Sequence, residues 1–288
     1  MNAWPYPLWI AHRGAGKLAP ENTLAAFRVG AGHGYRAFEC DVKLSADGVP
    51  FLLHDDGLQR TTPASGIAGQ RPWAELSRLD AGGWHSRAFA GEPLPSLDAI
   101  AGYCLRNGFA LNIEIKPTTG LEAETGRVVA LAAERLWAGQ AVPPLLSSFN
   151  PDALQSARGS SPKLPRALLL DTLWDGWFEA AQALGCVAVV TNHALMDAPL
   201  IERAGQPIPV TLFLTYWFGL VVNRAGRQVA RLERSSGLQP VGQLAQSPTR
   251  GSSAGQVQLR DRHRLTPQAT LQLHPHSLRQ CRVSPAKG

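Results

Sequence analysis

Residues 37–55 read AFECDVKLSADGVPFLLHD, and this stretch contains the clearest structural signal in the chain. Its two apolar runs, 37–44 and 49–53, are separated by only four residues, among them Asp47-Gly48. An Asp-Gly pair between apolar runs is typical of a tight hairpin turn, so we predict two antiparallel strands.

Apolar runs and helical patterns alternate outward from this hairpin, between residues 8 and 191. We expect further strands at 8–11, 109–115, 145–148, 166–170 and 187–191, and helices at 21–32, 96–107, 121–137, from 151 onwards and at 177–184. Strands that alternate with helices in this way indicate a parallel α/β sheet. The length favours a (β/α)8 barrel of the TIM type, in which the antiparallel hairpin is an exception.

Residues 56–95 form a connection far longer than is usual within a compact domain. It contains several Gly and Pro residues and large aromatic side chains at Trp73, Trp84 and Phe89. Loops of this length are usually either functional or disordered, and the sequence leaves both interpretations open.

The composition is that of a globular protein, because 44% of the 288 residues are hydrophobic. The N-terminus lacks the basic and apolar regions of a secretory signal. The longest apolar run, 209–222, would extend only about 21 Å as a helix, against about 30 Å for a bilayer core, so no membrane span is expected. Cys40, Cys104, Cys186 and Cys281 show no CxxC spacing. Reduced thiols in the cytoplasm therefore fit better than a zinc site or a disulfide framework.

The net charge of +6 comes entirely from the C-terminal part of the chain. Residues 1–203 contain 17 basic and 20 acidic side chains, whereas residues 204–288 contain 11 basic and 2 acidic ones. The later part is also richer in Gln, and its last fifty or so residues show no apolar periodicity. We therefore divide the chain into a barrel segment, 1–204, and a basic segment of low order, 205–288.

Three carboxylates occupy positions that favour a metal site. Glu39 and Asp41 are two residues apart on the expected strand 37–44, so both point to the same face. Glu114 lies within the apolar strand 109–115. Buried carboxylates on one face repel one another and are costly to desolvate, whereas a bound cation removes both penalties. Oxygen ligands favour a hard ion, Mg²⁺ or Ca²⁺.

Histidines and cations are found at the ends of the same strands. His54 ends the second strand of the hairpin and His12 follows the first expected strand, so both are predicted at the rim where barrel active sites occur. Two histidines suit phosphodiester cleavage, because one can accept a proton from the nucleophile while the other donates one to the leaving alcohol. Arg13 and Lys116 are suited to binding the phosphate. Taken singly, each residue also has an ordinary structural interpretation.

The candidate residues belong to motifs that occur in order along the chain: His12-Arg13-Gly14, Pro20-Glu21-Asn22-Thr23, Glu39-Cys40-Asp41-Val42, Asp47-Gly48, His54-Asp55, Glu114-Ile115-Lys116-Pro117, Ser147-Ser148-Phe149 and Thr191-Asn192-His193. This series resembles the glycerophosphodiester phosphodiesterase family, most closely its short cytoplasmic bacterial members. The resemblance covers about residues 6–203.

The resemblance implies a metal-dependent barrel enzyme that hydrolyses glycerophosphodiesters to sn-glycerol 3-phosphate and an alcohol. A glycerol hydroxyl would attack first, giving a cyclic phosphate that water then opens. The implied site consists of the acid–base pair His12 and His54, the phosphate-binding cations Arg13 and Lys116, and the metal ligands Glu39, Asp41 and Glu114. The 56–95 segment corresponds to the family's insertion on the glycerol side, where Trp84 or Phe89 would pack on the substrate or serve only the fold.

The chain departs from the family after about Arg203. A strand with a Trp/Tyr-Thr-Val-Asn-like end and a last strand of the Gly-Val-Asp-Gly type are absent from the sequence, so we expect the closing strands of the barrel to be missing or replaced. We consider two hypotheses: a shift of reading frame near codon 205, or a genuine basic tail that binds acidic partners. The tail lacks the motifs of nucleic-acid binders, so no nucleic-acid partner is expected. The functional alternative is a non-catalytic relic of the barrel.

Overall fold

The computed structural model describes residues 4–7, 9–192 and 195, together with the backbone of three short strands at 211–214, 220–222 and 228–231. The motif residue His193 lies outside this description. The two hypotheses of a shifted reading frame and a basic tail concern residues 205–288, of which only the backbone of these three strands is described.

Helices and strands alternate along the described chain, as the apolar pattern predicts. In chain order they are α1 (Leu24–Gly32), β1 (Ala37–Leu44), β2 (Pro50–Leu52), η1 (Ala68–Gln70), α2 (Trp73–Leu76), η2 (Arg87–Phe89), α3 (Leu97–Arg106), β3 (Ala110–Ile115), α4 (Glu122–Leu136), β4 (Leu145–Ser148), α5 (Pro151–Ser160), β5 (Arg166–Leu170), α6 (Trp177–Ala183), β6 (Ala188–Thr191), β7 (Thr211–Leu214), β8 (Leu220–Val222) and β9 (Gln228–Arg231). Side chains of Thr23, Ser96 and Asn150 cap α1, α3 and α5 by accepting backbone hydrogen bonds. None of the described helices combines the length and apolar character needed to cross a bilayer.

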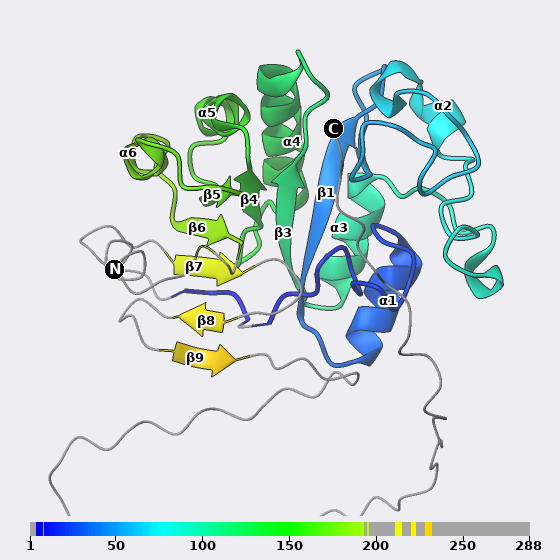
Figure 1. Ribbon diagram of the computed structural model, residues 1–288, viewed down its shortest axis with the longest axis horizontal. Helices are drawn as coiled ribbons and strands as arrows, with labels where there is room; N and C mark the ends of the chain where they lie inside the picture. Colours follow the sequence, from blue (N-terminus) through cyan, green and yellow to red (C-terminus); the bar gives the residue numbers. More distant parts are fainter. Residues whose placement is uncertain are drawn as a thin grey trace, which may run out of the picture. The chain divides into compact units, whose positions relative to one another are not determined.

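The strands form one sheet in the order β2-β1-β3-β4-β5-β6-β7-β8-β9. Neighbouring strands are parallel along β1-β3-β4-β5-β6-β7. The pairs β1–β2, β7–β8 and β8–β9 are antiparallel. Figure 1 shows α4, α5 and α6 along one side of this sheet. Since β2 and β9 are its two ends, the described strands form an open sheet, in agreement with the expected loss of closing strands. The apolar run 209–222 contributes two short strands, β7 and β8.

The first expected strand, 8–11, is reduced to a single bridge in the described residues. Ala11 pairs with Phe38 in parallel, and Leu8 lies outside the description. The prediction of a full strand is wrong for the described part because the partner strand begins too late. With Ala11 opposite Phe38 in parallel, residues 9 and 10 lie opposite residues 36 and 37, and β1 begins only at Ala37.

The predicted hairpin is confirmed. β1 and β2 are antiparallel, with Lys43 opposite Phe51, and the Leu53 amide donates to the Asp41 carbonyl at 3.1 Å. Gly48 has a φ of 76°, which a residue with a side chain rarely adopts. The turn therefore brings the residue after Leu53, which is His54, back to the level of the carboxylates on β1.

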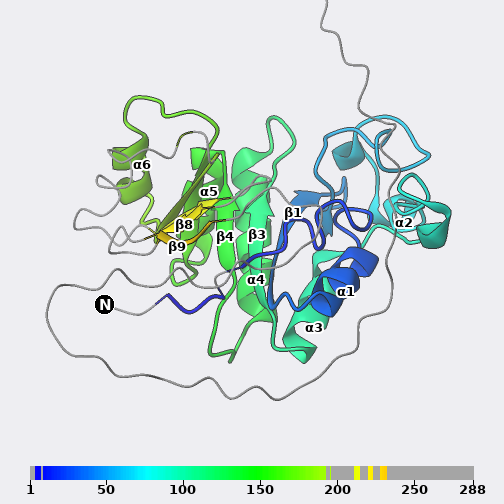
Figure 2. The same ribbon diagram turned by 60° about the horizontal axis from the view of Figure 1, so that its bottom comes forward.

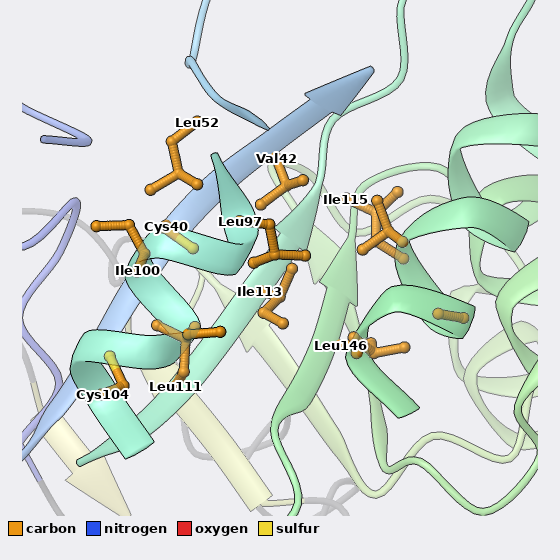
Figure 3. Close-up of a cluster of buried hydrophobic side chains, with 14 of the residues drawn as sticks. Cys40, Val42, Leu52, Leu97, Ile100, Cys104, Leu111, Ile113, Ile115 and Leu146 are labelled. Carbon is orange, nitrogen blue, oxygen red and sulfur yellow. The ribbon is translucent and has the colours of Figure 1, made fainter. Parts of the chain in front are cut away.

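One face of β1 and β3 packs against α3. Figure 3 shows Cys40 and Val42 of β1 close to Leu97 and Ile100 of α3, and all four side chains are fully buried. Burying an aliphatic side chain of this size contributes roughly 1.5–3 kcal/mol. Because successive side chains of a strand alternate between faces, Asp41 points away from this core. The apolar face thus fixes which face of the strand presents the carboxylates.

Residues 56–95 are ordered around a small apolar cluster, which includes Leu58 and Leu76 and is shared with Phe51 of β2. Both views place this segment, with α2, near one end of β1 (Figure 1, Figure 2). The Glu92 carboxylate accepts a hydrogen bond of 2.9 Å from the Ala25 amide in the first turn of α1. Of the two interpretations left open by the sequence, disorder is therefore excluded.

Candidate active site

Glu39 and Asp41 of β1 and Glu114 of β3 form a buried cluster. Asp41 and Glu114 are direct partners in the parallel register, and oxygen atoms of the three carboxylates lie within 4.8 Å of one another. Burial and the neighbouring Asp41 raise the pKa of Glu39 well above its usual value, and the same causes raise the pKa of Glu114 to about 7. This crowding of acidic groups is unfavourable unless a positive charge compensates it.

The cluster fits a hard divalent cation. Glu39 Oε1 and Asp41 Oδ1 are buried oxygens without a hydrogen-bond partner. An unsatisfied buried carboxylate oxygen costs free energy, and a metal ion would satisfy it. The donor set contains only carboxylate oxygens, which Mg²⁺ and Ca²⁺ prefer. The predicted ligands are thus brought together, although the identity of the ion remains a proposal.

The loop before α1 reaches the cluster through Arg13 and Asn22. The Arg13 amide donates to Glu39 Oε2 at 2.9 Å, and its Nε lies 3.2 Å from Asp41 Oδ2. The Asn22 side chain both donates to Asp41 Oδ2 (2.8 Å) and accepts from the Asp41 amide (3.1 Å). Arg13 and Asn22 have φ values of 52° and 57°, a conformation that costs about 1–3 kcal/mol for residues of this kind. These contacts hold that strained loop against β1.

His12 lies at the edge of the cluster, with Nε2 3.8 Å from Glu39 Oε2. Burial, and then the adjacent Arg13 charge, lower the pKa of His12 to about 4. In the substrate-free protein its imidazole is therefore neutral at pH 7.

His54 makes two hydrogen bonds that define its tautomer. Nδ1 donates to Asp55 Oδ1 at 2.7 Å, and Nε2 accepts from Lys116 Nζ at 3.0 Å. An ammonium group has no lone pair to accept with, so the Nε2 atom must present its lone pair. Burial lowers the pKa of His54 in spite of the opposing charge of Asp41. The neutral ring is thus held with Nε2 towards the carboxylates.

Lys116 joins the histidine to the carboxylates. Its Nζ lies 3.1 Å from Glu114 Oε1 and 3.8 Å from Asp41 Oδ1. Burial alone would lower the pKa of Lys116, but Glu114 and Asp41 outweigh it, and the net shift is upward. Lys116 is therefore charged and suited to binding an anion. All seven predicted site residues belong to one network of contacts: His12, Arg13, Glu39, Asp41, His54, Glu114 and Lys116.

A model of the glycerophosphoryl diester phosphodiesterase family matches residues 12–213. The chain belongs to this family. Similar proteins include the putative glycerophosphodiester phosphodiesterase YhdW of Bacillus subtilis, 34% identical over 162 residues, which are 56% of this chain and 64% of that protein. A glycerophosphodiester phosphodiesterase of Caldanaerobacter subterraneus is 35% identical over 162 residues, 56% of this chain and 66% of that one. The chain thus spans just under two thirds of the length of these two relatives.

Solved structures of this family share the fold. A phosphodiesterase from Oleispira antarctica, in complex with the product sn-glycerol-3-phosphate, is 33% identical with a TM-score of 0.68, over 74% of this chain and 86% of that one. A glycerophosphodiester phosphodiesterase from Agrobacterium tumefaciens is 29% identical with a TM-score of 0.60, over 73% and 86%. The predicted barrel class is therefore confirmed, and the family match extends beyond Arg203, where the motif resemblance ends.

In this family member a cleft opens beside the network and is lined in part by Lys43, His54, Asp56, Lys116 and Phe149. The Lys43 side chain is only 2% exposed, and its Nζ donates to Asp56 Oδ1 (2.6 Å) and the Lys116 carbonyl (3.3 Å). Lys43 is not among the residues that the motifs predicted. Its position two residues after Asp41 on the same strand face is the signal that could have found it.

Glu21, Asn22 and Arg60 also make contacts at the site that the sequence did not predict. The first two stand in a recognised motif but received no role, and Arg60 lies in the insertion.

Trp84 and Phe89 flank the His85 ring, with centroids 5.6 Å and 5.4 Å away. Substrate packing by these two aromatics stays a prediction.

Proposed function

We propose that this chain hydrolyses glycerophosphodiesters to sn-glycerol 3-phosphate and an alcohol. The observation that supports this most directly is the position of Lys116 Nζ, within hydrogen-bonding distance of both His54 and Glu114. An acid–base group, a phosphate-binding cation and a candidate metal ligand thus meet at one atom. Family membership supports the same reaction class.

Glu39, Asp41 and Glu114 would hold a divalent cation, Mg²⁺ or Ca²⁺. When bound, this ion would offset negative charge on the phosphoryl oxygens. Arg13 and Lys116 would hold the phosphate oxygens from either side of the carboxylates, and Arg13 can do so with two parallel hydrogen bonds.

The tautomer of His54 favours it as the proton acceptor, because Nε2 presents a lone pair towards the site. Once Lys116 turns to the substrate phosphate, Nε2 would take the proton of the attacking glycerol hydroxyl, leaving His12 to donate a proton to the departing alcohol. The anionic phosphate beside His12 would favour its protonated form.

A cytoplasmic location, suggested by the cysteine pattern, is likewise a proposal; the described Cys40, Cys104 and Cys186 are free and buried.

Turnover is the test of this function. The purified full-length chain is expected to release glycerol 3-phosphate from glycerophosphoethanolamine with Mg²⁺ or Ca²⁺ present, and to lose this activity in EDTA. An open sheet among the described strands favours the alternative, a folded but non-catalytic relic. Folded protein that gives no release with either ion would establish that alternative.

Metal binding is expected to show in thermal stability independently of turnover. At an ion concentration of about 100 Kd the stabilisation is about 2.7 kcal/mol, or roughly 5 °C or more in Tm for a domain of this size. Glu39→Gln removes one of three mutually repelling carboxylates, so its metal-free Tm should equal or exceed that of the wild type.

The Glu39→Gln variant should also lose the rise of Tm on adding Mg²⁺ or Ca²⁺. Glu75→Gln, at an exposed position of helix α2, is the matched control and should keep that rise. Differential scanning calorimetry of the three proteins decides the matter. An equal rise in Glu39→Gln and wild type would remove Glu39 from the ligand set.

A further inference from the structure

We propose that Arg60, in the 56–95 insertion, is a positioning residue that holds His54 and Arg13 in their working orientations. The inference rests on the proposed function, because the roles of His54 and Arg13 come from it. It is carried by four hydrogen bonds from one guanidinium group to two carboxylates, Asp55 and Glu21, and by the hydrogen bonds of these carboxylates to His54 and Arg13.

Arg60 fixes the carboxylate that orients His54. Its Nε donates to Asp55 Oδ2 at 2.5 Å, and its Nη2 donates to Asp55 Oδ1 at 3.0 Å. The same Oδ1 accepts the 2.7 Å hydrogen bond from His54 Nδ1. A carboxylate held by two bonds from a planar guanidinium has little freedom to rotate. The ring of His54 therefore keeps its orientation, and Nε2 remains directed at Lys116.

Arg60 also engages the carboxylate that competes with substrate for Arg13. Its Nη1 and Nη2 donate to the two oxygens of Glu21 at 2.9 Å and 2.7 Å. Arg13 Nη1 donates to Glu21 Oε1 at 2.9 Å. A substrate phosphate must compete with Glu21 for Arg13, and Arg60 weakens that competition by sharing the Glu21 charge.

The surroundings suit a positioning role better than a role in stability. The Arg60 side chain is 41% exposed, and exposed ion pairs contribute little to folding. Its backbone is nevertheless held, because Leu58 is fully buried and its carbonyl accepts from both the amide and the hydroxyl of Thr62. The N–H donors of the Arg60 guanidinium reach Asp55 and Glu21 at the same time. The single ammonium group of a lysine cannot reproduce this arrangement.

Steady-state kinetics on the full chain tests the proposal. Arg60→Ala is expected to lower kcat by about 10- to 100-fold, the usual effect of removing such a supporting group, and to raise KM. Arg60→Lys should recover only part of this loss. Arg71→Ala is the matched control: Arg71 lies in the same insertion, is 43% exposed and pairs only with Glu75 among the carboxylates of the described residues, so kcat should stay within about twofold.

The Nδ1–H group of His54 gives a readout that does not depend on turnover. Proton and nitrogen NMR of the histidine rings, with the His54 signals assigned by their loss in His54→Ala, should show a hydrogen-bonded, downfield-shifted Nδ1–H in the wild type and in Arg71→Ala. In Arg60→Ala the tautomer should persist, because Lys116 still donates to Nε2, but the Nδ1–H signal should move upfield as the Asp55 carboxylate becomes free to rotate. An unchanged Nδ1–H signal in Arg60→Ala, or an unchanged kcat, would overturn the proposal. An inactive wild type would sink the proposed function, while the NMR result would still decide the part of the proposal that concerns His54.

Discussion

His54→Ala is expected to lower kcat for glycerophosphodiester hydrolysis by about 10²- to 10⁴-fold, the usual contribution of a general acid or base. The variant should fold normally, because the ring is partly exposed and packs in no apolar cluster of the described residues. Its removal eliminates the Nε2 lone pair beside Lys116 and leaves Asp55 still paired with Arg60.

The control for this prediction is His33→Ala. His33 is exposed and follows the last residue of α1, so its loss should leave kcat unchanged. His12→Ala should resemble His54→Ala, and the double variant should be little worse than either single one, because groups that act in one step are not additive. A kcat for His54→Ala within a few-fold of the wild type would refute the assigned role.

Gly30→Ala is expected to destabilise the protein by about 1–3 kcal/mol and to reduce kcat/KM as well. A Cβ at Gly30 would lie 2.2 Å from the Gly14 carbonyl oxygen and 2.9 Å from the Phe38 ring. Neither neighbour can yield easily, since Phe38 is fully buried and Gly14 has a φ of 96°. The loop that carries His12 would have to shift.

Gly32→Ala, on the same helix, is the matched control. A Cβ at Gly32 meets nothing within 4 Å, so the same substitution should raise stability by about 0.4–1 kcal/mol through loss of backbone freedom in the unfolded chain. Thermal unfolding of both variants should shift Tm in opposite directions, by about 2–4 °C for each kcal/mol. Equal shifts would contradict the proposed contact between α1 and the Gly14 loop.

Short-range patterns in the sequence were sufficient for most of the secondary structure and for the membership of the site. β4 and β5 lie at the predicted residues 145–148 and 166–170, because an apolar run and its flanking caps are properties of one segment. The hairpin follows from Asp47-Gly48 for the same reason. Motif order along the chain indicated the family, which the match over 12–213 establishes.

Contacts between distant segments could not be obtained in this way. Asp41 and Glu114 become partners only because β1 pairs with β3 in one particular parallel register. Arg60 reaches Glu21 only because the insertion folds back over the loop that precedes α1. Residues 8–11 have a strand pattern, yet Ala11 makes a single bridge because its partner strand, β1, begins only one residue before Phe38. Such features depend on which elements become neighbours in space, and no single segment encodes that choice.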